Sequence, residues 1–141
     1  MSNYTRFDAG DLTDWSKLEF LHPKFPRPVR GKFFLGQPLG LTGMEVSINS
    51  LPPSAAMPFL HTHREHEEVY IFLSGEGEFV VDSERFAVKA GTTVRVGLEG
   101  KRGWRNTGTA PLVYVVIQAR AGSVGAVPIA DGEPCAEAPA W

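Results

Sequence analysis

The sequence is poor in cysteine and in long apolar runs. Cys135 is the only cysteine among 141 residues, so no disulfide can form within the chain, and a reducing compartment, the cytoplasm, is expected. Residues 1–15 contain no apolar segment of the kind that a signal peptide needs. No apolar run approaches the ~20 residues that span a bilayer, so a membrane is not an expected partner.

Basic clusters are also absent from the chain. Lys and Arg number 14 and Asp and Glu number 16, which gives a formal net charge of −2. Without a positive patch, nucleic acid and anionic membranes are poor partners, and a small-molecule ligand is the partner that we expect. The length of 141 residues fits one domain, which can bury a core without disulfide or metal staples.

Glycine and proline are plentiful, with 15 and 11 residues, and they divide the chain into short runs of β-branched and aromatic residues. These runs have the composition of strands, and turn signals separate them at intervals of roughly 8–12 residues. The pattern predicts an all-β sandwich or barrel. The predicted strands cover residues 31–35, 44–51, 68–73, 77–81, 85–88, 93–96 and 112–119.

The two ends of the chain differ from its middle. Residues 1–40 are predicted to form an N-terminal arm that packs on a barrel of residues 41–120. Residues 121–141 are rich in Ala, Gly and Pro, and they are predicted to form a C-terminal tail. A short helix is expected within residues 11–21, with Thr13 as its cap.

The predicted strand at residues 112–119 reads LVYVVIQA and is apolar on both faces. A strand exposed on one side alternates between apolar and polar residues, so this strand is expected to be covered on both sides. One cover is the barrel interior. The other is either the N-terminal arm or a second subunit, and a homodimer is the assembly that we expect.

Three of the four histidines fall in one stretch, HTHREHEEVY at residues 61–70. His61 and His63 alternate, so on a strand their imidazoles point to one face and can converge on one metal ion at ~2.0–2.2 Å. Glu68 opens the next predicted strand and adds a carboxylate. Two imidazoles and one carboxylate leave open positions for water or substrate. We therefore predict a metal site at His61, His63 and Glu68, and the alternative is a polar hairpin of solvated charges.

The other polar residues of this stretch have different expected roles. His66 is compatible with a further ligand, a hydrogen-bond partner of a ligand, or a surface loop residue. Glu67 faces the opposite side of the strand from Glu68 and is predicted to be a surface or interface charge. Glu65 is predicted to be solvated. The sequence does not select the divalent ion, because Zn, Mn, Ni, Fe and Co all accept these donors.

Residues 40–120 resemble the cupin superfamily. The first motif of that family is G-x5-H-x-H-x3,4-E-x6-G. His61, His63, Glu68 and Gly75 match its two histidines, its glutamate and its last glycine, and Ala55 replaces its first glycine. The resemblance implies a small β-barrel of the jelly-roll kind.

The second cupin motif, G-x5-P-x-G-x2-H-x3-N, is half present. It runs from Gly91 to Asn106, and Arg102 occupies the position of its histidine. The resemblance implies a metal site of three histidines and one glutamate, so the last histidine is missing here. Arginine cannot replace it, because a guanidinium has no free lone pair and its charge repels a cation.

Two arrangements of Arg102 are physically coherent. In the first, Arg102 swings away, and the metal keeps His61, His63 and Glu68. In the second, Arg102 points inward and pairs with Glu68, and the site is free of metal. Tyr70 and Gln118 are predicted to line the site as substrate-binding residues, and Arg102 is predicted to hold an oxyanion or phosphate.

The stretches GLTGMEVSIN, HTHREHEEVYIFLSGEGEF and GKRGWRN also resemble small single-domain cupins described as sugar isomerase- or mutarotase-like. This resemblance implies a metal-dependent enzyme that acts on a sugar or sugar phosphate by Lewis-acid chemistry, with Glu68 and Arg102 as catalytic residues. The alternatives are a non-catalytic module that binds a small molecule and a non-haem iron dioxygenase.

Overall fold

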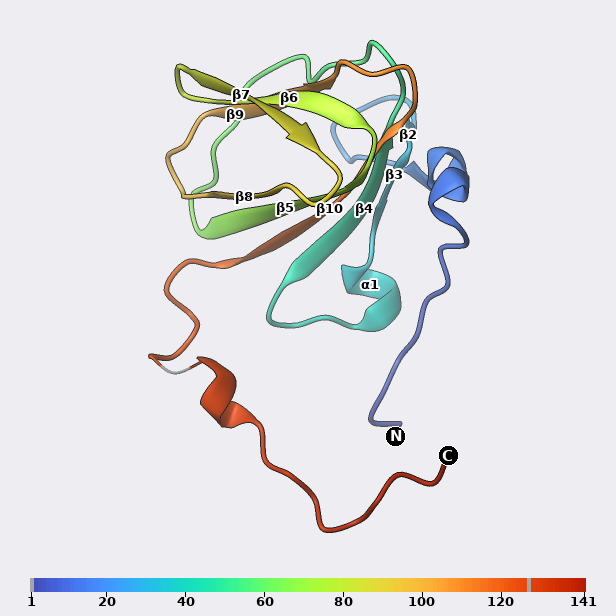
Figure 1. Ribbon diagram of the computed structural model, residues 1–141, viewed down its shortest axis with the longest axis vertical. Coiled ribbons are helices and arrows are strands. Elements are labelled where there is room, and N and C mark those ends of the chain that lie inside the picture. The colour runs from blue at the N-terminus through green and yellow to red at the C-terminus, as the bar shows by residue number, and fades with distance from the viewer. Residues whose placement is uncertain (1, 127) are drawn as a thin grey trace.

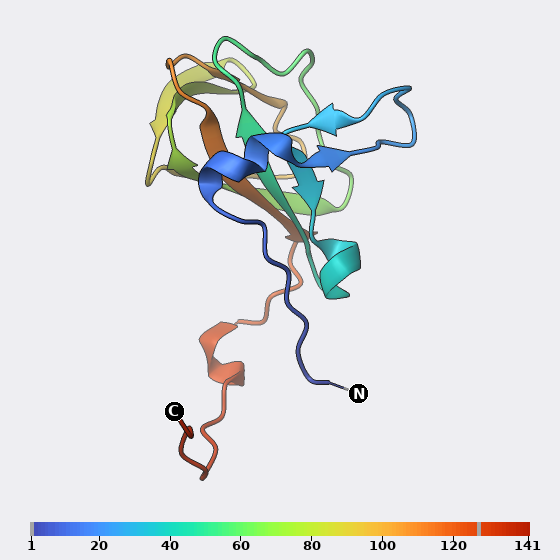
Figure 2. The same cartoon turned by 90° about the vertical axis from the view of Figure 1, so that its right-hand side faces the viewer.

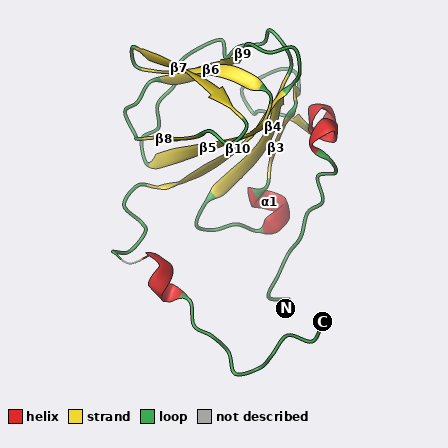
Figure 3. Cartoon of the chain, in the orientation of Figure 1, coloured by secondary structure: helices red, strands yellow, loops and turns green. Residues whose placement is uncertain are grey.

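The computed structural model describes residues 2–126 and 128–141, and most of its regular structure consists of short strands in two facing sheets (Figure 1). The strands are β1 (Glu19–Phe20), β2 (Val29–Arg30), β3 (Lys32–Phe34), β4 (Glu45–Leu51), β5 (His66–Ser74), β6 (Glu76–Val81), β7 (Glu84–Lys89), β8 (Thr93–Val96), β9 (Arg102–Asn106) and β10 (Leu112–Arg120). The helical segments of the described residues are 3₁₀ helices at Leu12–Lys17 and Pro128–Asp131 and α1 (Gly36–Leu39), and they lie outside the sheets (Figure 3).

The prediction of an all-β fold is confirmed. One sheet has the antiparallel strand order β3-β4-β10-β5-β8, and the other has the order β7-β6-β9. β1 and β2 pair separately. Figure 1 shows the smaller sheet lying over β5 and β8, so the two sheets form a sandwich that is open at one end. The predicted strands correspond to β3 to β8 and β10, whereas β9 begins within a segment that was expected to be a turn.

Alternate side chains of β5 fill the space between the two sheets. Tyr70 and Phe72 are completely buried, and Tyr70 lies edge-on to Phe79 of β6 with ring centroids 4.9 Å apart. Trp104 of β9 stacks on Phe79 at 5.7 Å. Because β5 alternates, Glu68 shares the inward face of Tyr70, and the sandwich interior therefore carries a carboxylate at its end.

The outer face of β10 is covered by the N-terminal arm. Trp15, in the first 3₁₀ helix, packs with Ile48 of β4 and Val113 of β10. Figure 2 shows this helix lying across the outer side of the sheet. The double cover predicted for β10 is therefore present within one chain. The homodimer stays a prediction, and this face no longer argues for it.

Two details of the arm differ from the expectation. The first 3₁₀ helix has Asp11 as its N-cap, so the prediction that Thr13 caps it is wrong, because Thr13 lies within the first turn. Lys32–Phe34, which belongs to the predicted arm, pairs with β4 as the edge strand β3. At the other end, residues 121–126 and 128–141 extend away from the sheets (Figures 1 and 2), and Trp141 is fully exposed. Among the described helices, none has the length and apolar character needed to cross a bilayer.

Gly75 joins the two sheets at the turn between β5 and β6, and it generates a prediction. Its φ is +86°, and a Cβ there would lie 2.4 Å from the Pro111 carbonyl oxygen. Gly75→Ala should therefore lower the free energy of unfolding by at least about 2 kcal/mol, through strain and a clash with backbone. Gly43→Ala is the matched control, because nothing lies within 4 Å of the added Cβ. Urea unfolding of both variants measures the effect, and equal midpoints would contradict it.

Candidate metal centre

Glu68 and the two histidines reach the same point from different elements. Glu68 is the third residue of β5, on its inward face. His61 and His63 lie in the loop before β5, so the prediction that both histidines stand on a strand is wrong. The loop is instead tied to its surroundings at two points. His61 forms an isolated antiparallel bridge with Arg102, and the His63 N–H donates to the Leu98 carbonyl oxygen at 3.1 Å.

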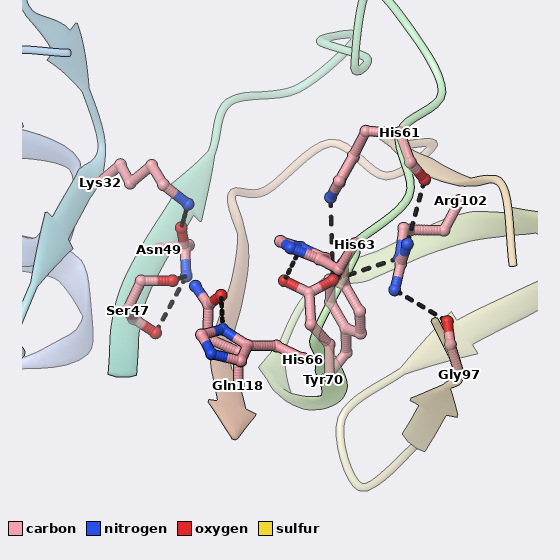
Figure 4. Close-up of polar contacts among 11 residues, drawn as sticks. Lys32, Ser47, Asn49, His61, His63, His66, Tyr70, Gly97, Arg102 and Gln118 are labelled. Carbon is pink, nitrogen blue, oxygen red and sulfur yellow. Dashed lines mark hydrogen bonds and ion pairs between the residues drawn. The ribbon is translucent and has the colours of Figure 1, made fainter. Parts of the chain in front are cut away.

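The side chains of His61, His63 and Glu68 converge, as predicted (Figure 4). His61 Nε2 lies 3.7 Å from Glu68 Oε2, and His63 Nε2 lies 3.0 Å from Glu68 Oε1. One ligand atom from each of the three residues lies within 4.8 Å of the others. Two atoms bound ~2.1 Å from the same ion are ~3.0 Å apart at a right angle and ~3.4 Å apart at the tetrahedral angle. The observed spacing is therefore close to that of ligands that share one ion.

The chemistry of these donors also fits a divalent cation. His63 Nε2 is buried, and it has no hydrogen-bond partner of good geometry among the described residues. Burial lowers the pKa of His63, although the negative charge of Glu68 acts in the opposite direction. The lower pKa favours the neutral imidazole, which is the form that binds a metal ion. Burial alone would raise the pKa of Glu68, but His61, Tyr70, His63 and Arg102 together hold it at about 2. His63 and Glu68 are therefore held in the protonation states in which they can bind a metal ion.

Arg102 points inward, as in the second arrangement considered for it. Its side chain is completely buried, and its Nε lies 3.2 Å from Glu68 Oε2. Its two terminal nitrogens donate to the carbonyl oxygens of His61 at 3.1 Å and of Gly97 at 3.2 Å. The inward position of Arg102 leaves the histidines close to Glu68, because Arg102 pairs with Oε2 of the carboxylate and His63 faces Oε1. An inward Arg102 is thus geometrically compatible with the convergence of His61, His63 and Glu68.

Tyr70 holds the same carboxylate oxygen as Arg102. Its hydroxyl donates to Glu68 Oε2 at 2.5 Å, and the residue is completely buried. Burial and the charge of Glu68 raise the pKa of Tyr70, so the hydroxyl keeps its proton and remains a donor. Tyr70 and Arg102 therefore fix the orientation of the Glu68 carboxylate through its Oε2 atom, and neither side chain reaches solvent.

Gln118 and His66 lie at the edge of the cluster and contact each other. Gln118 pairs with Glu68 across β10 and β5, and its Oε1 accepts from His66 Nδ1 at 3.1 Å. The His66 ring is 6.4 Å from the His63 ring, outside the set of converging donors. The hydrogen bond of His66 goes to Gln118, which is not one of the predicted metal ligands. Both residues are half-buried, so they remain accessible to a small molecule.

The expected surface charges are confirmed. Glu67 faces outward, and its Oε2 accepts from Arg95 Nε at 2.7 Å. Glu65 is exposed. Glu68 is thus the member of this acidic run that lies inside the sandwich, as the strand alternation predicted.

Sequence reasoning missed a polar row on the inner face of β3 and β4. Lys32 pairs with Asn49 in register, and Ser47 lies two residues from Asn49 on the same face. The side chains of these residues contact one another, and Figure 4 shows them on the side of His63 that faces away from Arg102. A signal was present, because the polar residues Ser47 and Asn49 alternate with the apolar residues Val46 and Ile48.

Comparison with known proteins identifies close relatives of this fold. The family model described as "Cupin domain" matches residues 48–118. A crystal structure of a cupin protein from Bacteroides fragilis is 32% identical, with a TM-score of 0.78 over 96% of this chain and 99% of that one. The structure of a putative sugar phosphate isomerase from Acidithiobacillus ferrooxidans is 27% identical, with a TM-score of 0.58 over 63% of this chain and 58% of that one.

A curated relative matches a shorter segment of this chain. An uncharacterized protein of Methanocaldococcus jannaschii is 33% identical over 63 residues, which are 45% of this chain. The chain matches 50% of the length of that relative. The likeness to it therefore covers only a part of each protein.

The buried ion pair generates a prediction about stability. Arg102→Met leaves Glu68 buried without its cation, and the free energy of unfolding should fall by about 3–5 kcal/mol. Arg95→Met removes an exposed ion pair to Glu67 and should change it by no more than about 1 kcal/mol. Urea unfolding of the two variants gives the comparison. Equal and small losses would show that the Arg102–Glu68 pair does not hold this end of the sandwich together.

Proposed function

Because this chain belongs to the cupin domain family, we propose that it binds a divalent metal ion through His61, His63 and Glu68. One observation carries the proposal: one ligand atom from each of the three side chains lies within 4.8 Å of the others, and the buried Nε2 of His63 points at Oε1 of Glu68 from 3.0 Å. Two imidazoles and a carboxylate that converge in this way are a donor set that a divalent metal ion accepts.

The protein's own residues prepare this centre. Tyr70 and Arg102 hold one oxygen of Glu68, which leaves the other oxygen beside His63. The Arg102 guanidinium also holds the His61 carbonyl, so the same side chain fixes the loop that carries the two histidines. A bound ion would supply Lewis-acid polarisation of a carbonyl or hydroxyl oxygen. Glu68 and Arg102, predicted to be catalytic, then act as a ligand and as a positioning residue.

We further propose that the ligand is a small hydroxylated molecule, a sugar or sugar phosphate, and that the chemistry is of the isomerase or mutarotase type. The amide of Gln118 and the imidazole of His66 supply hydrogen-bonding groups at the accessible edge of the cluster. The likeness to a putative sugar phosphate isomerase supports this choice. Among the predicted substrate-binding residues, Gln118 is exposed enough to touch a ligand, whereas the burial of Tyr70 and Arg102 favours an indirect role.

Metal content tests the first part of the proposal. His61→Ala and His63→Ala should each reduce the bound metal, measured as the metal-to-protein ratio by elemental analysis, from about one toward zero. His66→Ala is the matched control, since His66 lies outside the converging set, and it should keep the ratio of the wild type. A ratio that does not change in either of the first two variants would refute the metal site.

Turnover tests the second part. The metal-loaded protein should interconvert isomers or anomers of a sugar or sugar phosphate, followed by NMR over a panel of such compounds. The protein loaded with metal should be compared with the His63→Ala variant, which should be inactive. Saturable binding without any turnover would support the non-catalytic module instead. Oxygen consumption with iron restored would support the dioxygenase.

A further inference from the structure

The polar row on β3 and β4 takes no part in the metal centre. Lys32, Asn49 and Ser47 share the inner face of the larger sheet with Glu68 and Gln118. Apolar residues would normally occupy such positions between two packed sheets. Polar side chains there need hydrogen-bond partners, or a ligand that supplies them.

Lys32 is a cation without a counter-ion. Its Nζ donates to Asn49 Oδ1 at 3.0 Å and lies 4.8 Å from the centre of the Phe34 ring. Among the described residues, no carboxylate lies within 4.0 Å of it. An ammonium has three N–H donors, so one is used by Asn49, and the described part of the chain offers no hydrogen-bond acceptor to the other two. This is the arrangement of a site that can accept an anion.

Burial also shifts the protonation equilibrium of this ammonium. It lowers the pKa of Lys32 to about 8, and the attraction of Glu68 opposes it. A group with a pKa of about 8 is still mostly charged at neutral pH. The positive charge is therefore present under ordinary conditions, but it is poorly hydrated, and an ion pair with it is stronger than one at the surface.

Asn49 holds Lys32 in place. The Asn49 Nδ2 donates to the Ser47 carbonyl at 3.1 Å and to Ser47 Oγ at 3.0 Å. It also lies 3.4 Å from the Tyr114 carbonyl. With the amide nitrogen committed to these acceptors, Oδ1 must face Lys32. The ammonium is thus positioned before any ligand arrives, which reduces the entropy lost on binding.

Other cations near the cluster are less suited to this role. Arg102 is completely buried, and its terminal nitrogens are held by carbonyl oxygens. Arg64 and Lys101 line a groove of about 480 Å³ beside His63, but both are exposed, and Glu99 lines the same groove. Lys32 combines partial burial, a fixed position and free donors, and Figure 4 shows it on the side of His63 that faces away from Arg102.

We propose that Lys32, positioned by Asn49, binds the carboxylate or phosphate group of a hydroxylated ligand whose remaining oxygens reach the metal centre. The ligand class is therefore an anionic sugar derivative, a sugar acid or a sugar phosphate, and neutral sugars bind more weakly. The inference deepens the proposed function and rests on it for the position of the other oxygens. The anion contact itself depends only on the surroundings of Lys32.

Calorimetric titrations test this with three probes that share a sugar framework: glucose 6-phosphate, gluconate and glucose. The wild-type protein, in its purified metal state, should bind at least one of the two anions more tightly than glucose. Lys32→Met should weaken the binding of that anion about ten- to a hundredfold, because a charge-assisted hydrogen bond is lost, and should leave glucose unchanged. The two anions distinguish a phosphate from a carboxylate ligand.

Two control variants complete the experiment. Lys32→Arg keeps the charge and should keep most of the affinity for the anion. Lys101→Met removes one of the two cations that line the groove beside His63, and it should leave the affinities for the anions and for glucose unchanged. The proposal is overturned if neither anion binds the wild type better than glucose, if Lys32→Met binds them as the wild type does, or if Lys101→Met causes the loss instead.

The metal-to-protein ratio separates this proposal from the proposed function. It should be the same in Lys32→Met as in the wild type, because Lys32 is not among the converging donors. If the wild type holds no metal but Lys32→Met still loses anion binding, the metal site fails and the anion site stands. A normal metal ratio in both proteins, together with unchanged anion binding, refutes the anion site alone. Removing a poorly hydrated cation should not unfold the protein, and circular dichroism verifies this.

Discussion

The negative charge of Glu68, buried at the end of the sandwich, is the constraint on which the surrounding structure depends. A carboxylate taken out of water needs hydrogen bonds and an opposite charge. Tyr70 supplies the hydrogen bond, and Arg102 supplies the charge. Arg102 in turn holds the carbonyl oxygens of His61 and Gly97. One buried charge thus connects β5, β9, the histidine loop and the loop between β8 and β9.

The two oxygens of the Glu68 carboxylate have different neighbours. Oε2 contacts Tyr70 and Arg102 and lies 3.7 Å from His61 Nε2, while Oε1 faces His63. The guanidinium then lies close to any bound cation, which should make the metal affinity lower than that of a centre with a third histidine in its place. The same charges make the interior attractive to anions once a metal is bound, because Lys32 and Arg102 together outweigh Glu68. An anionic ligand would restore the balance, so the metal site and the Lys32 site reinforce each other.

Much of this organisation could be predicted from the sequence, and the exceptions have physical reasons. Short β-rich runs between glycines and prolines predicted the all-β fold, and the positions of His61, His63 and Glu68 predicted their convergence. The reason given for that convergence was wrong, because a bridge to Arg102 and a hydrogen bond to Leu98 orient the loop, not a strand period. Such tertiary contacts leave no local signal. β9 was missed for the same reason: RGWRN contains glycine and two charges, and its pairing with β6 overrides these weak propensities. The burial of Lys32 and Arg102 was equally hidden, since charged residues are normally found at the surface.

The central claim is that a metal ion binds between the Glu68 carboxylate and the two imidazoles while Arg102 stays in contact with Oε2. An anomalous difference map tests this most directly, recorded from crystals of the purified protein above the absorption edge of the metal that it contains. The account predicts a peak ~2.0–2.2 Å from His61 Nε2, His63 Nε2 and a Glu68 oxygen, with Arg102 still in contact with the carboxylate. No peak between these three side chains, or a peak accompanied by an Arg102 that has moved away from Glu68, would contradict it.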